Sequence, residues 1–452
     1  MAKRLPASIK AATARELALQ VLRDVFGPAQ RGAQESLEYR AGRAALDARE
    51  VALATELAYG TVKMRRRLEW HLRPYLGERL HTVPEPIREL LFLGAYQLLL
   101  ADGIAEHAAV FETVDLARRL GHRGTAGLVN AVLRSIQRDR PVPPARDVFD
   151  DDDEYLGTAH SFPTWIVRAW RERFGPRLVE VLEACNRPAR GALRVNLLKG
   201  GVEEARDVLF ARGFPSEVSA LAPECLVPTG PRFTRVLEQS DPGRWTLQGE
   251  TACLPPRLLA PQPGETVFDL CCGRGHKSLQ LAALMENRGV LWAVDDHAGR
   301  LKVLAEAAAA AGVECLRALA ADLTKPWPEP LAAADRILLD APCSGLGILG
   351  RAPEARWRKS PEDAPRLAET QRAMLVRALQ ALAPGGRLVY AVCSTDPREG
   401  EGVVAAALAA VPEALTVAPP ERLAAFACPP GILIPPGLEG RDGFFIAILA
   451  RG

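Results

Sequence analysis

The chain has 452 residues, of which 48% are hydrophobic and 25% are charged, the composition of an ordinary globular protein. This length predicts about three domains of roughly 150 residues each. The longest mainly apolar stretch, residues 90–101, is shorter than the roughly 18–20 residues that a membrane-spanning helix needs. No apolar segment of a secretion signal follows the first ten residues. These features argue against membrane and secreted classes and favour a cytoplasmic protein.

Cysteine content and charge narrow the possible partners. The nine cysteines include no Cys-x-x-Cys pair, so neither a zinc ribbon nor a thioredoxin-type motif is expected, and we predict no metal site. The first 140 residues hold 22 basic and 16 acidic side chains, although the net charge of the whole chain is only +2. A mildly basic N-terminal third is compatible with RNA as a partner, or with a solvated helical surface.

The hydrophobic pattern divides the chain into three parts. Apolar residues recur at helical spacing throughout residues 11–140, which predicts an all-helical domain. Prolines at 141, 143 and 144 and the acidic run 150–154 are typical of a linker. Beyond it, residues 155–245 combine a helical pattern at 165–174 with a short strand pattern at 193–197, which indicates a small α+β module.

From Pro263 onward, short apolar runs alternate with helical segments. One helix is predicted over 301–311, with Gly312 as its C-terminal cap. Strands and helices in alternation predict a parallel sheet covered on both faces, with the last run a candidate antiparallel edge strand. The predicted strands are 266–270, 290–294, 337–339, 388–392 and 444–449.

A glycine-rich turn follows the first of these strands. Such a turn lets the backbone approach a ligand and directs helix N–H groups toward it. Asp295 ends the second strand, where an acid can bind ribose hydroxyls, and Asp322 follows a third strand. A nucleoside-bearing cofactor is therefore favoured, although Ser278 replaces the last glycine of the full motif and a plain tight turn is the alternative. The turn consists of Cys271, Cys272, Gly273, Arg274, Gly275, His276 and Lys277.

Two cysteines follow predicted strands: Cys343, within Asp340-Ala-Pro-Cys-Ser-Gly, and Cys393. The carboxyl ends of parallel strands are where open α/β sheets place their sites, so the pair indicates thiol chemistry in a cleft. With a nucleoside cofactor this suggests methyl transfer to carbon 5 of cytosine. A thiolate that adds to carbon 6 makes carbon 5 nucleophilic, and a nearby acid can stabilise the adduct.

At these motifs the chain resembles the Sun-type RNA cytosine-5 methyltransferases, which use S-adenosylmethionine. Asp340-Ala-Pro-Cys-Ser-Gly is similar to the family's fourth motif and Val392-Cys-Ser to its sixth, and Gln248-Gly-Glu and Asp442-Gly-Phe-Phe also match. Leu128-Val-Asn-Ala-Val-Leu-Arg resembles the last helix of a NusB-like domain. The resemblance implies an all-α NusB-like RNA-binding domain over 1–145, a small α+β linking module over 155–245, and a Rossmann-like methyltransferase domain over 246–452.

The resemblance also implies roles for residues. Cys393 would be the nucleophile, Cys343 would assist resolution of the adduct, and Asp340 would face the cytosine edge. The implied substrate is small-subunit ribosomal RNA, acted on by a monomer. The residues implied to line the cofactor are Cys271, Cys272, Gly273, Arg274, Gly275, His276, Lys277, Asp295, Asp322 and Asp340.

Three alternatives stay open. Cytosine-5 DNA methyltransferases carry their nucleophile in a Pro-Cys motif, so Pro342-Cys343 keeps Cys343 as a second candidate nucleophile. The family's cofactor loop reads Cys-Ala-Ala-Pro-Gly-Gly-Lys, whereas Arg274 and His276 add bulk here. A non-catalytic RNA-binding or ribosome-assembly factor is therefore the rival interpretation. A nicotinamide-dependent dehydrogenase fits the turn but leaves both cysteines unexplained.

Basic clusters outside these motifs are candidate RNA contacts or simply solvated surface. They are the triplet at 65–67, the pair at 118–119, and Trp357 with its neighbours Arg356, Arg358 and Lys359, which suit stacking on an unpaired base.

Overall fold

The computed structural model describes residues 11–452, and their contacts divide the chain into two compact units. One unit holds the chain up to Asn186 together with Ala352–Arg358, and the other holds Arg187–Arg351 and Lys359–Gly452. Among the described residues, every helix is too short or too polar to cross a bilayer.

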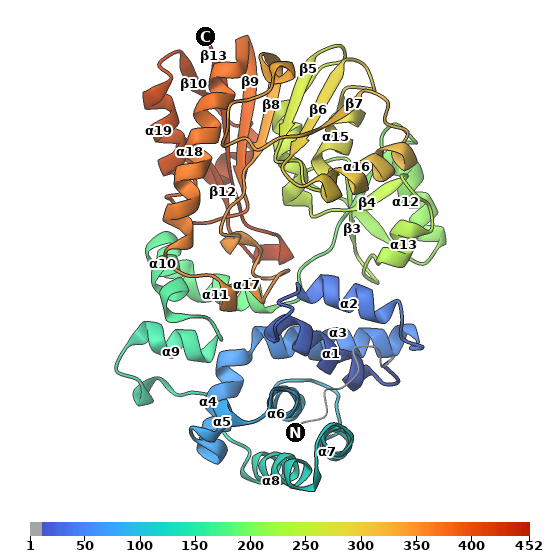
Figure 1. The fold of residues 1–452 in the computed structure, drawn as a ribbon, viewed down its shortest axis with the longest axis vertical. Coiled ribbons are helices and arrows are strands. Elements are labelled where there is room, and N and C mark those ends of the chain that lie inside the picture. Colours follow the sequence, from blue (N-terminus) through green and yellow to red (C-terminus); the bar gives the residue numbers. More distant parts are fainter. Residues whose placement is uncertain (1–10) are drawn as a thin grey trace. The chain divides into compact units, whose positions relative to one another are not determined.

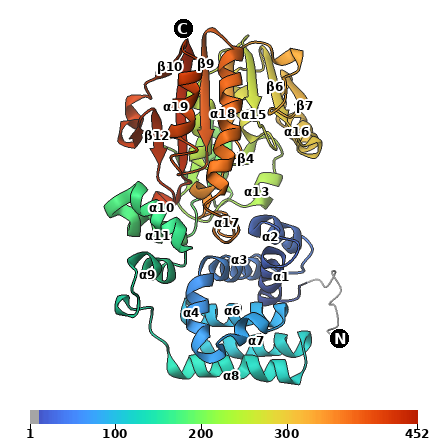
Figure 2. The ribbon, with the colours of Figure 1, turned by 60° about the vertical axis from the view of Figure 1, so that its left-hand side comes forward.

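The first unit is helical over its described residues (Figures 1 and 2). Its first helix begins behind Thr13, whose hydroxyl accepts a hydrogen bond from the Glu16 N–H. The leucines that the periodicity predicted as core, such as Leu17 and Leu22, are fully buried. The helices are α1 (Ala14–Phe26), α2 (Ala33–Ala41), α3 (Ala48–Lys63), α4 (Arg65–Leu76), α5 (Arg79–Thr82), α6 (Glu85–Leu99), α7 (Glu106–Leu120), α8 (Arg123–Asp139), α9 (Asp152–Ala159), α10 (Thr164–Phe174), α11 (Leu178–Asn186) and α17 (Ala355–Arg358).

The acidic run predicted as linker begins a helix instead. Asp151 caps α9 by accepting a hydrogen bond from the Asp153 N–H, and the next three residues are the acidic first turn. Negative charge is favourable at a helix N-terminus because it meets the positive end of the helix dipole. Arg168 and Arg171 of α10 pair with Asp151 and Asp153 at 2.5 and 2.6 Å. The sequence shows the charges but not these partners.

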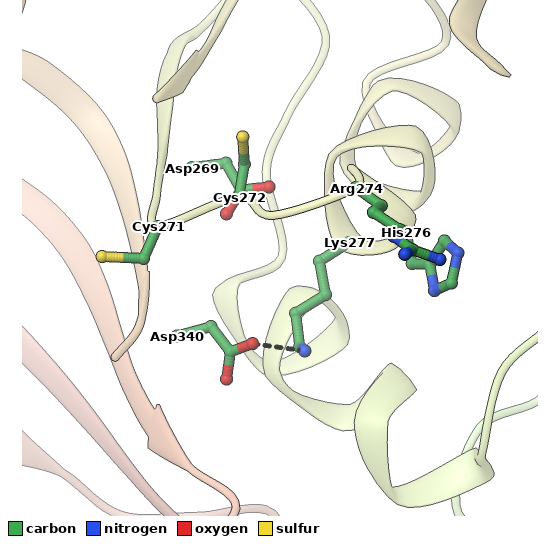
Figure 3. A pocket seen from close by; sticks show the side chains of 7 residues that line it. All are labelled: Asp269, Cys271, Cys272, Arg274, His276, Lys277 and Asp340. Atoms are coloured by element: carbon green, nitrogen blue, oxygen red, sulfur yellow. Dashed lines mark hydrogen bonds and ion pairs between the residues drawn. The ribbon is translucent and has the colours of Figure 1, made fainter. Parts of the chain in front are cut away.

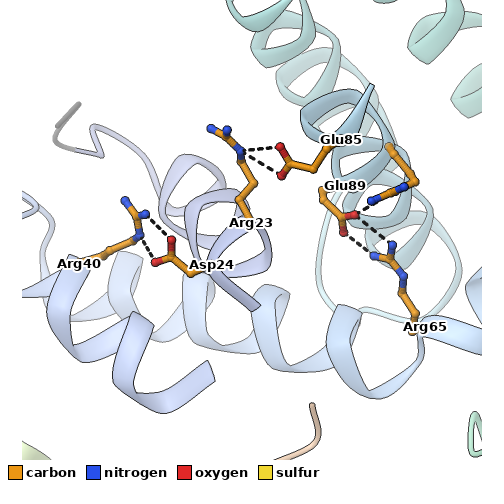
Figure 4. Close-up of polar contacts among 7 residues, drawn as sticks. Arg23, Asp24, Arg40, Arg65, Glu85 and Glu89 are labelled. Carbon is orange, nitrogen blue, oxygen red and sulfur yellow. Dashed lines mark hydrogen bonds and ion pairs between the residues drawn. The ribbon is translucent and has the colours of Figure 1, made fainter. Parts of the chain in front are cut away.

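Several arginines of this unit are engaged in internal contacts. Arg65 forms an ion pair with the buried Glu89, and Arg40 and Arg23 pair with Asp24 and Glu85 (Figure 4). The next two arginines of the basic triplet donate to the carbonyl oxygens of Phe162 and Ala159. The triplet therefore makes contacts inside the unit, so its interpretation as simply solvated surface is wrong, and RNA contact by these half-buried arginines stays a prediction.

Helix α17 also belongs to this unit. Arg356 is fully buried, stacks 3.8 Å from the Phe162 ring centroid, and donates to Ser161 O at 3.1 Å and Asn186 Oδ1 at 2.9 Å. The Trp357 indole N–H donates to Val62 O at 2.7 Å. Both earlier interpretations of this segment, base stacking and surface loop, are therefore wrong for Arg356.

The second unit opens with a small α+β module, but the helix predicted over 165–174 as part of this module, α10, belongs to the first unit. Four strands form an antiparallel sheet in the order β2-β3-β1-β4. Two helices accompany the sheet, and Leu193, Leu226 and Trp245 are buried in its core. The elements are β1 (Leu193–Val195), α12 (Val202–Ala211), β2 (Ser216–Val218), β3 (Cys225–Pro228), α13 (Arg235–Gln239) and β4 (Trp245–Leu247).

The rest of the unit is a mixed nine-stranded sheet. Its order is β11-β12-β13-β9-β8-β5-β6-β7, with β10 paired to β13, and the run from β9 to β7 is parallel. The strands are β5 (Thr266–Leu270), β6 (Val290–Asp295), β7 (Leu316–Ala320), β8 (Ala334–Asp340), β9 (Leu382–Val392), β10 (Ala414–Val417), β11 (Ala427–Cys428), β12 (Gly431–Ile434) and β13 (Phe444–Arg451).

Helices cover both faces of this sheet (Figures 1 and 2). On one face, Phe268 and Tyr390 pack in a core with Leu375 of α18 (Asp363–Ala381) and Val404 of α19 (Glu401–Ala410). On the other face, the core holds residues of α14 (Leu254–Leu259) and α15 (His276–Leu284), and α16 (Ala298–Ala311) packs over β6. Successive side chains of a strand point to opposite faces of the sheet. Because helices cover both faces, the side chains on both faces are apolar.

The predicted last strand is antiparallel to β9 but does not lie at the edge. β13 pairs with β9 on one side and with β12 and β10 on the other. Its apolar residues from Phe444 to Leu449 are therefore buried, which explains the continuous apolar run. The short neighbouring strands carry too weak a pattern to be predicted.

Candidate active site

The glycine-rich turn has the tight backbone that its sequence suggested. Cys271, Gly273 and Gly275 have positive φ values of 62°, 59° and 83°, and α15 starts directly afterward. A Cβ on Gly275 would lie 2.0 Å from Leu304 Cδ1, so this position requires glycine. Asp295, buried at the end of β6, accepts a hydrogen bond from the Gly273 N–H at 2.9 Å. The carboxylate thereby holds the turn against β6.

A pocket of about 130 Å³ opens beside this turn (Figure 3). The side chains of Arg274 and His276 extend away from Lys277 and Asp340 in the close-up, so the bulk noted in the sequence does not fill the space between the strand ends (Figure 3). The lining residues are Asp269, Cys271, Cys272, Arg274, His276, Lys277 and Asp340.

An ion pair crosses the pocket. Lys277 Nζ donates to Asp340 Oδ2 at 2.6 Å and lies 5.7 Å from the centroid of the Phe444 ring. Burial lowers the pKa of Lys277, but the nearby negative groups, chiefly Asp340 with Asp269, together outweigh burial, and the net pKa is above its ordinary value. Lys277 therefore stays a cation at neutral pH, with Asp340 as its partner.

Asp269 is an acid that the sequence analysis did not single out. It lies on β5, is fully buried, and accepts a hydrogen bond from Ser278 Oγ at 2.5 Å through Oδ2. Its other oxygen, Oδ1, receives no hydrogen bond from the described residues. Burial raises the pKa of this carboxyl to about 7. A buried carboxyl is unfavourable without a partner, so an aspartate inside the apolar run 266–270 was the feature of the sequence that could have identified Asp269 as a site residue.

The two cysteines meet at the ends of adjacent parallel strands. Asp340 of β8 is in register with Ala391 of β9, and the turns that follow bring Cys343 Sγ to 3.3 Å from Cys393 Sγ. The contact with Cys393, burial, and the nearby Glu399 and Asp340 carboxylates raise the pKa of Cys343 above its ordinary value. Cys393 remains partly exposed rather than sealed in apolar packing.

Close backbone packing supports the Cys393 turn. Gly347 N–H donates to Cys393 O at 2.9 Å, and a Cβ at Gly347 would lie 2.1 Å from Gly443 O. Gly347 therefore lies between the Cys393 turn and Gly443 of the Asp-Gly-Phe-Phe segment, and the backbone contacts on both sides leave no room for a side chain at Gly347.

Two of the residues predicted to line the cofactor, Asp295 and Asp322, do not line the pocket. Asp322 is exposed beyond β7, where it accepts hydrogen bonds from Thr324 N and Oγ1 at 3.0 and 2.6 Å, and it does not line the pocket. Asp295 contacts the turn rather than the pocket. The remaining predicted residues lie on the turn or at the two strand ends.

A Rossmann-like sheet with a glycine-rich turn after its first parallel strand and a pair of cysteines at two neighbouring strand ends fits a methyltransferase of the nucleic-acid-modifying class. Comparison with known proteins supports this class. The family 16S rRNA methyltransferase RsmB/F matches residues 256–450, the NusB family matches 12–138, and the ferredoxin-like domain of RsmF/B-like methyltransferases matches 162–233.

Full-length relatives agree. The chain is 34% identical to the probable ribosomal RNA small subunit methyltransferase B of Bacillus subtilis, over 88% of this chain and 90% of that protein. It is 35% identical to the ribosomal RNA small subunit methyltransferase B of Thermus thermophilus, over 98% and 99%. The crystal structure of the protein PH0851 superposes with a TM-score of 0.82 and 25% identity, covering 99% and 100%. The chain belongs to the RsmB/F family of 16S rRNA methyltransferases.

Proposed function

We propose that this chain transfers the methyl group of S-adenosylmethionine to carbon 5 of a cytosine in small-subunit ribosomal RNA, through a temporary bond to Cys393. The observation that carries the proposal is the thiol pair, with 3.3 Å between the Cys343 and Cys393 sulfurs. The pair follows β8 and β9, and Asp340 of β8 also lines the pocket. The names of the relatives support ribosomal RNA as the substrate.

The pocket residues suit S-adenosylmethionine. The buried Asp269 Oδ1, which receives no hydrogen bond from the described residues, is a suitable acceptor for the ammonium group of the cofactor. The turn from Cys271 to Lys277 offers backbone at the start of α15. Asp295, buried at the end of β6 beside the turn, is the proposed ribose contact, whereas the exposed Asp322 lies outside the pocket lining. When bound, the cofactor supplies an electrophilic methyl group.

The chain's own residues then account for the chemistry on the base. Cys393 Sγ is proposed to bond to carbon 6, which raises electron density at carbon 5. Asp340 faces the amino edge of the ring, where its carboxylate accepts a hydrogen bond from the amino group, and the Lys277 cation beside it offsets the negative charge that the adduct acquires. After carbon 5 gains its methyl group, the Cys343 sulfur, as a thiolate next to Cys393, is proposed to take the carbon 5 proton. The electron pair of that C–H bond restores the 5,6 double bond, the carbon–sulfur bond breaks, and Cys393 leaves as a thiolate.

The target cytosine must be unpaired or rotated out of its helix, because a stacked base cannot reach a thiol in the turn after β9. The half-buried position of Cys393 is consistent with a single inserted base.

The test uses the full-length protein with small-subunit ribosomal RNA from a strain that lacks the gene. We expect Cys393→Ala to abolish both methylation and the covalent RNA adduct, and Cys343→Ala to accumulate the adduct. Cys428→Ala, a half-buried thiol that donates to Glu401, is the control. The reverse pattern would exchange the two roles. Calorimetry with S-adenosylmethionine addresses the rival binding-only function, for which no cofactor heat is expected.

A further inference from the structure

The buried carboxylate of Glu399 joins the two cysteine-bearing turns. Glu399 is fully buried. Its Oε1 accepts hydrogen bonds from Ser344 N at 2.8 Å and from Gln371 Nε2 at 3.1 Å. Its Oε2 accepts from the hydroxyls of Ser344 and Ser394, each at 2.5 Å. One side chain therefore binds both turns.

The position of the two serines makes this contact relevant to the site. Ser344 directly follows Cys343, and Ser394 directly follows Cys393. Their hydroxyl oxygens lie 3.0 Å apart, in parallel with the 3.3 Å between the two sulfurs. Movement of Glu399 would therefore move the residue beside each thiol.

Other buried groups fix Glu399 itself. The Tyr390 hydroxyl on β9 donates to the Glu399 carbonyl oxygen at 2.6 Å and lies 3.2 Å from Gln371 Oε1. Gln371 on α18 also donates to Pro342 O at 2.8 Å, directly before Cys343. The network thus connects α18, β9 and both turns.

The energetics favour a specific role for the charge. A buried carboxylate is unfavourable unless hydrogen bonds compensate for lost hydration, and the four hydrogen bonds described here come from neutral donors. Hydrogen bonds to an ionised acceptor are roughly twice as strong as neutral ones, so this carboxylate is the strongest local connection between the turns.

We propose that Glu399 is a positioning residue that holds the sulfurs of Cys343 and Cys393 beside each other for their separate roles. This inference rests on the proposed function of the two cysteines.

The first experiment measures adduct formation in a single turnover, with S-adenosylmethionine and a small-subunit ribosomal RNA transcript containing 5-fluorocytidine, which cannot lose a proton from carbon 5. We expect Glu399→Gln to slow adduct formation about 10- to 100-fold, the size expected for a small displacement of reacting groups. The KM for RNA and the cofactor affinity should stay near wild type. Glu369→Gln, an exposed acid on α18, is the matched control and should behave as wild type.

The second experiment needs no RNA. Phenylarsine oxide bridges two neighbouring thiols with release of water, and its affinity depends on their spacing. The second close pair, Cys225 and Cys253 at 3.0 Å, is removed beforehand with Cys225→Ala in every protein compared. We expect Glu399→Gln to weaken arsenical binding at least about 10-fold, since two thiols held less closely lose effective concentration.

The outcomes separate this inference from the proposed function. Loss of both adduct rate and arsenical affinity supports it. Unchanged arsenical affinity overturns it, whatever happens to the adduct rate, and so does an unchanged adduct rate in an active enzyme. If wild type forms no adduct, the proposed function fails and the arsenical comparison alone decides. If Glu399→Gln does not fold, Ser344→Ala, which removes one of the four donors to Glu399, takes its place.

Discussion

Replacing Asp269 with asparagine should change how the stability of the second unit depends on pH. Asp269 is fully buried, and burial raises its pKa from 3.8 to about 7. In the unfolded chain the same carboxyl ionises near its ordinary pKa, so the folded protein binds more protons between about pH 4 and 7. The stabilising contribution of protonated Asp269 is therefore lost as pH rises through that range.

The size of the effect follows from the same values. At about 1.4 kcal/mol for each pH unit between 3.8 and about 7, ionisation of Asp269 costs at most about 4 kcal/mol. Asparagine cannot ionise, so the stability of Asp269→Asn relative to wild type should rise by up to that amount between pH 4.5 and pH 8.5. Any loss of the hydrogen bond with Ser278 lowers the stability of the variant by a similar amount at pH 4.5 and at pH 8.5, so it does not affect this difference.

The assay is urea unfolding of both full-length proteins at several pH values, followed by tryptophan fluorescence and fitted with separate transitions for the two units. Asp296→Asn, an exposed aspartate directly after β6, is the control and should follow wild type. Parallel stability curves for wild type and Asp269→Asn between pH 5 and pH 8 would refute the reasoning. The same variant should bind S-adenosylmethionine more weakly, if Asp269 receives the cofactor's ammonium group.

Two further substitutions test other parts of the fold. Arg356→Ala should lower the unfolding free energy of the first unit by about 2–4 kcal/mol, because Ser161 O and Asn186 Oδ1 lose their donor inside the core; an unchanged unfolding midpoint in circular dichroism would contradict this. Gly275→Ala should weaken S-adenosylmethionine binding at least about 10-fold, because its Cβ would overlap Leu304 at 2.0 Å and its φ of 83° suits glycine. Calorimetry checks the second prediction, and wild-type affinity would count against it.

Most elements of the fold could be predicted from local patterns of apolar and turn residues in the sequence. The predicted strand 266–270 coincides with β5, since a buried parallel strand is a short apolar run between turn residues. Gly312 ends α16 in the left-handed conformation that its position suggested. The short strands β10 to β12 were missed because each spans at most four residues and owes its pairing to β13 and its neighbours.

The site was predicted only where chemistry marks single residues. Cys343 and Cys393 stood out because thiols follow strand ends, and their meeting was expected from the parallel sheet. Glu399 gave no such signal, since an acid in a turn is usually solvated, and its burial depends on Ser344, 55 residues earlier in the sequence, as well as on the nearby Ser394. Arg356 was misread for the same reason, because its partners lie more than 150 residues away in sequence.

The placement of Ala352–Arg358 in the first unit has a consequence for dissecting this protein. A fragment that stops at Asn186 would keep the helices but lose the guanidinium and indole that occupy their interior, leaving the Val62 and Ser161 carbonyl groups without these donors. A fragment that starts at Arg187 would contain Ala352–Arg358 without the helices against which these seven residues pack. Truncation at the obvious boundary thus damages both halves, and either piece studied alone would understate the stability it has in the intact polypeptide.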